Sequence, residues 1–306
     1  MSDRNMELIK ETIEIINAGW YPSQKNCNSG HPVKTPLKLT KAQMSETIIL
    51  TDGKIRQLVD TPPYHGPIAM GRRCGFTVSN NDSFAAAIHM SNDYLFNKGH
   101  DKLLVLNFAN PEDPGGGVRG GAKAQEEDLC RKSTLLASLE STDAKEMYEH
   151  NRTQSFVLSS DYMILTPNVE IFRDENDGLL KESILVSVLS AAAPDISDGF
   201  EGISMENIEE IFYKRIMGVL QVATTYEYKH LVLGAWGCGA FGNDANLVAR
   251  LFYKAFKEIR CGKFLDVNSL FRRVEFAILD NSSEKNNIKC FEKYFSNFYS
   301  YEDESK

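Results

Sequence analysis

Paired carboxylates lie close to a run of glycines in this chain of 306 residues. Gly115, Gly116 and Gly117 are consecutive, and seven residues separate them from Gln125-Glu126-Glu127. Because glycine has no Cβ, its backbone can adopt positive φ angles and come close to a ligand. Two adjacent glutamates can supply a proton donor and a negative charge. The spacing therefore predicts an active-site loop followed by acid–base residues.

The apolar pattern on either side indicates which elements hold this loop. Residues 102–108 form a short apolar run typical of a buried strand, and residues 128–139 carry leucines at near-helical spacing. We therefore expect the glycines to join a strand to a helix that the carboxylates open. The less specific interpretation is a tight turn before acidic residues that favour a helix start through its dipole.

A second glycine-rich segment lies at residues 234–242. It follows the apolar run 230–233 and precedes a predicted helix that Asn243 or Asp244 would cap. Backbone N–H groups of such a loop can point together at a pyrophosphate. Close packing of a strand against a helix is the alternative explanation of these glycines. The presence of both loops in one chain favours ligand binding.

Four motifs together are similar to those of a known family. They are Asn107-Phe108-Ala109-Asn110, Pro114-Gly115-Gly116-Gly117, Gln125-Glu126-Glu127 with Leu129-Cys130-Arg131, and Gly234-Ala235-Trp236-Gly237-Cys238-Gly239-Ala240-Phe241-Gly242-Asn243. In type and order they resemble the signatures of poly(ADP-ribose) glycohydrolases of the compact microbial type. The similarity extends from about Phe76 to Phe291.

The resemblance implies both a fold and a reaction. The fold is an α/β, macrodomain-like α/β/α three-layer sandwich with a mixed central sheet. The reaction is hydrolysis of ribose–ribose O-glycosidic bonds in poly(ADP-ribose), which releases ADP-ribose. Cleavage of such a bond passes through an oxocarbenium-like state, so the leaving oxygen needs a proton and the sugar needs a nearby anion or dipole.

The resemblance also assigns catalytic roles to three residues. Glu127 would protonate the departing ribose oxygen and then, as a carboxylate, activate water at the anomeric carbon. Glu126 would position substrate hydroxyls and the neighbouring carboxylate, and Gln125 would help to orient both. A helix start favours ionised carboxylates, whereas two close carboxylates and burial favour a retained proton.

The predicted substrate-binding residues come from both loops. They are Asn110, Gly115, Gly116, Gly117, Gly237, Cys238, Gly239, Ala240, Phe241 and Gly242. The resemblance implies that Asn110 lies near the ribose whose bond is broken, although asparagine before proline can simply shape a turn. Phe241 could pack on a ribose or base, or belong to the core. The resemblance to macrodomains implies that Asp82 could contact adenine. It precedes Ser83, however, where helix capping is the simpler role, and we leave it outside the predicted site.

Two other functions remain open from the sequence. One is hydrolysis of another ADP-ribosyl linkage, such as a protein ester or a modified nucleic-acid base. The other is binding of ADP-ribose without catalysis. Glu126 and Glu127 argue against the second, because adjacent carboxylates repel a dianionic ligand.

Composition and charge restrict the class of protein and its partners. Apolar residues make up 42% and charged residues 25%, as in ordinary globular enzymes. The net charge of −8 opposes strong nonspecific nucleic-acid binding, so we expect poly(ADP-ribose) and ADP-ribosylated proteins as partners. Neither a membrane-spanning run nor a secretory leader is visible. We expect a cytoplasmic protein, or a nuclear one in a eukaryote, and not a secreted one.

Six scattered cysteines and six dispersed histidines show no zinc-site spacing. We therefore expect free thiols, no metal and no cofactor. Cys238 could resemble a nucleophile, but the sequence identifies no base for it. A small neutral filler is the favoured role.

The chain is divided by pattern into an N-terminal helical and hairpin extension, residues 1–70, and a catalytic domain, residues 71–306. In the extension we expect a helix over residues 6–18 ended by Gly19, a loop or wrapped arm over 20–41, and a hairpin turn at Asp52-Gly53. Further predicted strands are 76–78, 162–165, 184–191, 230–236 and 274–279, and further helices are 84–97 with Gly99 as its stop, 206–225, 245–257 and 283–295.

Overall fold

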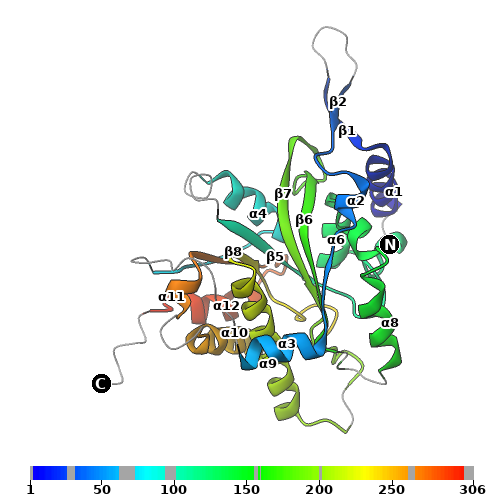
Figure 1. Ribbon diagram of the computed structural model, residues 1–306. Helices are drawn as coiled ribbons and strands as arrows, with labels where there is room; N and C mark the ends of the chain where they lie inside the picture. Colours follow the sequence, from blue (N-terminus) through cyan, green and yellow to red (C-terminus); the bar gives the residue numbers. More distant parts are fainter. Residues whose placement is uncertain are drawn as a thin grey trace.

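A seven-stranded mixed sheet forms the centre of the described structure (Figure 1). The computed structural model describes residues 3–25, 32–61, 73–93, 101–154, 158, 160–199, 202–260 and 266–299. In spatial order the strands are β3 (Ile48–Leu50), β6 (Met163–Arg173), β7 (Leu179–Ala191), β5 (Lys102–Phe108), β8 (Tyr228–Leu233), β9 (Arg273–Ala277) and β4 (Gly75–Ser79).

Strand direction divides the sheet into two parts. β7, β5, β8, β9 and β4 pair in parallel, whereas β3, β6 and β7 pair antiparallel at one edge. The predicted mixed sheet is therefore confirmed. β5 and β8 are parallel neighbours, so their carboxyl ends meet at the same edge, where ligands bind in open α/β sheets.

Helices cover both faces of the sheet, which makes the predicted three-layer sandwich. One face packs against α3 (Asp52–Asp60), α9 (Met205–Thr225), α10 (Ala245–Glu258) and α12 (Asn286–Phe295). The other packs against α1 (Asp3–Ala18), α4 (Ser83–Asn92), α6 (Gln125–Lys132), α7 (Leu135–Leu139) and α8 (Lys145–Thr153). Short helices occur at α2 (Lys41–Met44), α11 (Val267–Leu270) and the 3-10 turn Val118–Gly120. Within β5, Leu104 and Leu106 face the first layer while Leu103 and Val105 face the second.

The N-terminal segment forms a helix and then a ribbon. The predicted first helix is confirmed as α1, and Gly19 ends it with a φ of +75°. The loop expected after it is wrong, because β1 (Trp20–Lys25) and β2 (Pro32–Pro36) pair antiparallel and project from the body at the top of Figure 1. Prolines are tolerated here at the ends of β2 and at an irregularity beside Pro22.

The hairpin expected at Asp52-Gly53 is also wrong. Thr51 caps α3 by accepting a 3.3 Å hydrogen bond from the backbone N–H of Lys54, and Asp52 lies in the first turn. β3 forms the edge of the central sheet, and Leu58 lies in the main core. The boundary expected at residue 70 lies outside the described residues, as do Gly99, Cys27 and Cys261, so the division into extension and domain stays a prediction.

The helix expected over residues 128–139 is broken into α6 and α7. At the break, the N–H of Thr134 donates to the carbonyl of Glu170, and the N–H of Glu170 donates to Thr134 Oγ1 at 3.0 Å. Ser133 forms an isolated bridge with Ile171. Pairing with β6 thus replaces two residues of helix and fixes the end of α6 against the sheet.

Candidate active site

The sheet brings the two predicted loops together. The first follows β5 and the second follows β8, and parallel pairing sets both at one edge. A cavity of about 340 Å³ lies there. Its lining comprises Asn81, Asp82, Ser83, Phe108, Lys123, Ala124, Gln125, Asp128, Ala235, Trp236, Gly237, Gly239, Ala240, Phe241, Ala277, Ile278, Leu279 and Asn287. Gln125 thus faces the cavity, whereas Glu126 and Glu127 are buried beside it.

Both carboxylate oxygens of Glu126 are held by groups at the end of β5. The side-chain amide of Asn107 donates to Oε1 at 3.0 Å, and the backbone N–H of Asn110 donates to Oε2 at 2.8 Å. Asn107 is oriented in turn by a 2.9 Å hydrogen bond to Ser190 Oγ on β7. Only 2% of Glu126 is exposed.

Burial decides the charge of Glu126. It raises the pKa of this carboxyl to about 8, with the negative charge of Glu127 acting in the same direction. Hydrogen bonds from Asn110 and Asn107 lower the pKa and offset only part of this effect. The Glu126 side chain is therefore mainly neutral at pH 7.

Glu127 lies under the glycine run. The backbone N–H of Gly117 donates to its Oε1 at 2.9 Å, and its buried Oε2 receives no hydrogen bond from the described residues. Gly116 has a φ of +53°, and a Cβ at this position would lie 2.5 Å from Glu127 Oε1 and 3.2 Å from Glu126 Oε2. Only glycine fits there, so the close approach predicted for this loop is an approach of its backbone to the two carboxyl groups.

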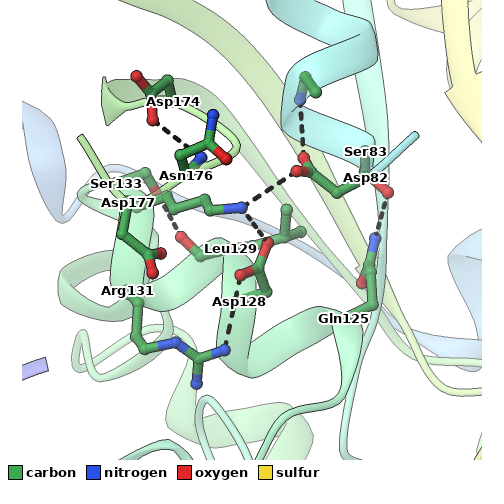
Figure 2. A network of polar contacts seen from close by, with 12 residues as sticks. Asp82, Ser83, Gln125, Asp128, Leu129, Arg131, Ser133, Asp174, Asn176 and Asp177 are labelled. Carbon is green, nitrogen blue, oxygen red and sulfur yellow. Dashed lines mark hydrogen bonds and ion pairs between the residues drawn. The ribbon is translucent and has the colours of Figure 1, made fainter. Parts of the chain in front are cut away.

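Gln125 anchors the first residue of α6 to β5 and α4. Its Oε1 accepts from the N–H of Phe108 at 2.9 Å, and its Nε2 donates to the carbonyl of Leu106 at 2.8 Å. The same Nε2 donates to Ser83 Oγ at 3.0 Å (Figure 2). These bonds set where the two following glutamates lie. They position the start of α6, and among the described residues no hydrogen bond joins the Gln125 amide to either glutamate carboxyl.

Asn110 shapes the turn that follows β5. Its Oδ1 accepts hydrogen bonds of 2.9 and 2.8 Å from the N–H groups of Glu112 and Asp113, and its own N–H binds Glu126. Both features fix the start of the first loop. The role of its side chain toward a ribose stays a prediction.

The second loop is held by Gly237 and Asn243. Gly237 has a φ of +74°, and a Cβ would lie 2.7 Å from both Ala193 Cβ and Asn243 Nδ2. The amide of Asn243 donates to Pro194 O at 2.7 Å and to Gly237 O at 3.1 Å. Of the two predicted helix caps, it is Asp244 that accepts from the N–H of Leu247, at 2.8 Å.

The remaining residues of the second loop differ in their surroundings. Gly239 is exposed to the cavity, and a Cβ there would meet no atom of the described structure within 4 Å. Phe241 is partly buried and also lines the cavity, as does exposed Ala240. Burial raises the pKa of the half-buried Cys238 thiol to about 12, so it is protonated at neutral pH, which agrees with a filler and not a nucleophile.

The cavity has lining residues that were not among the predicted site residues. Asp82 was set aside as a helix cap, and it does cap α4 by accepting a 2.7 Å hydrogen bond from Ala85 N–H, but it also lines the cavity. The end of β9 adds Ala277, Ile278 and the 61% exposed Leu279. The available signal was the polar triplet Asn81-Asp82-Ser83 directly after a predicted strand.

No group of three or more histidine, cysteine, aspartate or glutamate side chains could hold a metal ion within the described ranges. Among the same residues, none of the helices has the length and apolar character needed to cross a membrane.

Comparison with known proteins agrees with this geometry. The family model of the microbial-type PARG catalytic domain, PARG being poly(ADP-ribose) glycohydrolase, matches residues 9–174. The chain belongs to the microbial-type PARG family. No curated protein matched the sequence.

Solved PARG structures are similar over most of their length. The enzyme from Thermomonospora curvata has a TM-score of 0.82 and 32% identity, over 96% of this chain and 100% of that one. Its complex with the inhibitor ADP-HPD has a TM-score of 0.80 and 31% identity with the same coverage. PARG from Deinococcus radiodurans in complex with ADP-ribose has a TM-score of 0.74 and 32% identity, over 86% of this chain and 99% of that one.

Proposed function

We propose that this chain hydrolyses ribose–ribose O-glycosidic bonds of poly(ADP-ribose) and releases ADP-ribose. The observation that carries the proposal is the buried pair Glu126 and Glu127 at the carboxyl end of β5, beneath the glycine run. The chain's membership of the PARG family supports it. So do the related structures that hold ADP-ribose or ADP-HPD.

Glu127 is the proposed general acid. Both oxygens of Glu126 are occupied by Asn107 and Asn110, whereas Oε2 of Glu127 receives no hydrogen bond from the described residues. This oxygen remains for the substrate. With substrate bound, Glu127 holds a proton and gives it to the departing ribose oxygen as the glycosidic bond breaks. As a carboxylate it then takes a proton from the water that attacks the anomeric carbon. The second step regenerates the acid.

Glu126 contributes position and charge control. Its neutral form at pH 7 keeps the pair from carrying two negative charges, which would repel an anionic substrate. Each of its oxygens accepts one hydrogen bond, from Asn107 or Asn110, which fixes the carboxyl and leaves further lone pairs that can hold a ribose hydroxyl at a defined place. Asn110 lies at the same end of β5 and is proposed to contact this ribose as well.

The second loop is the proposed site of the pyrophosphate. Gly239 and Ala240 expose their backbone to the cavity at the start of the segment that leads to α10. Anions are stabilised by such N–H groups near a helix start. Phe241 offers an apolar ring beside them for a ribose or a base. In this arrangement Gly237 and Gly242 shape the loop through their positive φ angles.

The proposal includes the class of partner. ADP-ribosylated proteins that carry polymer are the expected substrates, inside the cell in the cytoplasm or, in a eukaryote, the nucleus. The net charge of −8 makes the local amides of the two loops, and not a basic surface, the means of holding a polyanion. Strong direct binding to nucleic acid is not expected.

Product analysis tests the proposal against its alternatives. The protein is incubated separately with defined ADP-ribose polymers, an ester-linked mono-ADP-ribosylated protein and an ADP-ribosylated nucleic-acid base, and released ADP-ribose is measured. We expect release from the polymer, with at least tenfold lower rates on the other substrates. Preference for either monomeric linkage would contradict the assigned bond. Tight ADP-ribose binding without release from any substrate would indicate a reader.

A further inference from the structure

One buried lysine joins two carboxylates of the cavity wall, Asp82 and Asp128, which are labelled in Figure 2. Lys132 lies at the end of α6, and 3% of its side chain is exposed. Its Nζ lies 3.1 Å from Asp82 Oδ2 and 2.8 Å from Asp128 Oδ2. Burying a charge without a partner is strongly destabilising. The two carboxylates therefore compensate the buried ammonium.

The two aspartates come from different elements and both line the cavity. Asp82 caps α4 with its other oxygen, through the N–H of Ala85 at 2.7 Å. Asp128 lies in the first turn of α6, directly after Glu127, and its Oδ1 is 3.5 Å from a nitrogen of Arg131. Lys132 therefore connects the start of α4 to the helix that carries both glutamates.

The charge balance of this wall matters for an anionic ligand. Asp82 and Asp128 would place two negative charges in a cavity that is proposed to receive a pyrophosphate, and like charges repel over several ångströms. The positive charge of Lys132, which is not among the residues that line the cavity, offsets these negative charges. Burial alone would lower its pKa, but attraction to Asp128 and Asp82 raises the pKa above the ordinary lysine value, so it stays charged at neutral pH.

We propose that Lys132 is a positioning residue that allows the cavity to bind an anionic ADP-ribosyl ligand. It acts through Asp82 and Asp128, by holding their carboxylates and offsetting their charge. The inference rests on the proposed function for the identity of the ligand. It adds that the negative charges of Asp82 and Asp128 must be offset for an anion to bind, and the group that does so lies outside both glycine-rich loops.

The first test replaces the ammonium by an apolar side chain of similar length, Lys132→Met. We expect the Kd for ADP-ribose, measured by calorimetry, to rise on the order of tenfold because the wall gains one uncompensated negative charge. KM for the polymer should rise in parallel, with kcat changed less than about threefold. Lys214→Met is the matched control, since Lys214 forms an exposed ion pair with Glu210 on α9.

The second test uses charge variants with opposite predicted signs. Asp128→Asn removes a negative charge from the wall and should increase ADP-ribose affinity, because the dianionic ligand then meets less repulsion. The double variant Lys132→Met with Asp128→Asn should recover most of the affinity lost in the single lysine variant. If Lys132→Met does not fold, the direction of the affinity change in Asp128→Asn decides between the two explanations. The charge argument predicts tighter binding in this variant, whereas a purely structural role of the network predicts weaker binding.

The outcomes separate this inference from the proposed function. The role of Lys132 alone would be overturned if native protein binds ADP-ribose and Lys132→Met keeps the native affinity. It would also be overturned if Asp128→Asn shows unchanged or weakened affinity. Native protein that does not bind ADP-ribose would overturn the proposed function and this inference with it.

Discussion

The backbone N–H of Gly117 donates a 2.9 Å hydrogen bond to Oε1 of Glu127. This bond joins the glycine run to the helix that the run precedes, and it leaves Oε2 of the same carboxyl without a partner among the described residues. The glycine run thus holds the Glu127 side chain in place, in addition to the ligand contact that its backbone was predicted to make. Changes in the run should therefore act on the chemical step as well as on binding.

Gly116→Ala should reduce turnover more than affinity. The added Cβ would lie 2.5 Å from Glu127 Oε1, and the residue has a left-handed φ of +53°, so the carboxyl or the loop must shift. A displacement of about 1 Å at a reacting group can lower the rate by about a hundredfold. We expect kcat on the polymer to fall by about that factor, with a smaller change in the Kd for ADP-ribose.

Gly120→Ala is the matched control for this change. Gly120 belongs to the same segment, has no positive φ, and a Cβ there would meet no described atom within 4 Å. Its kcat and melting temperature should stay close to those of the native protein. Equal losses of kcat in both variants would show that the segment as a whole, and not the contact with Glu127, controls the rate.

The pKa of Glu126 predicts a pH dependence of stability. The folded protein keeps this proton up to about pH 8, whereas the unfolded chain releases it near the ordinary value of 4.5. The folded state therefore binds more protons between these limits, and the free energy of unfolding should fall as pH rises through the window, by up to about 1.4 kcal/mol per pH unit. Urea titrations at pH 5.5, 6.5 and 7.5 measure the slope.

Glu126→Gln should remove this contribution, because the variant has no carboxyl to titrate. Glu149→Gln, an exposed position on α8, should keep the native slope. If native protein and Glu126→Gln lose stability with pH at the same rate, the buried carboxyl does not carry the proton that we assign to it.

Gly237 and Gly239, two glycines of the second loop, should respond differently to substitution. Gly239→Val adds bulk toward the cavity without a clash in the described structure, so ADP-ribose affinity should fall about tenfold or more while the melting temperature is unchanged. Gly237→Ala would place a Cβ 2.7 Å from Ala193 and Asn243 at a φ of +74°, so it should lower the melting temperature itself. If folded Gly239→Val keeps full affinity, the pyrophosphate does not bind at this part of the second loop.

The local patterns around the first loop were sufficient to predict its elements. The apolar run 102–108 is β5, and the carboxylates open α6, because both depend on residues that are adjacent in sequence. The break after Lys132 could not be seen in this way. It depends on hydrogen bonds between Thr134 and Glu170, whose pairing is set by the position of β6 in the sheet.

The same limit applies to the candidate site. The sequence identified Glu126 and Glu127 but not the groups that hold them, since Asn107 acts with Ser190 from a strand 83 positions away. Asp52-Gly53 was misread because this pair suits a tight turn, and it is Thr51 before it that starts a helix. The role of Lys132 could not be predicted from the sequence, because it depends on contact with Asp82, which caps α4 and lies 50 positions earlier in the chain.

The most direct measurement of the central claim is Glu127→Gln, assayed for both binding and cleavage. The substitution preserves shape and keeps an oxygen for the Gly117 N–H, but it removes the proton donor. We predict ADP-ribose affinity within about threefold of native by calorimetry, and polymer cleavage reduced by a factor on the order of 10³ or more. A folded variant that cleaves polymer at close to the native rate would contradict the assignment of Glu127, whatever its affinity.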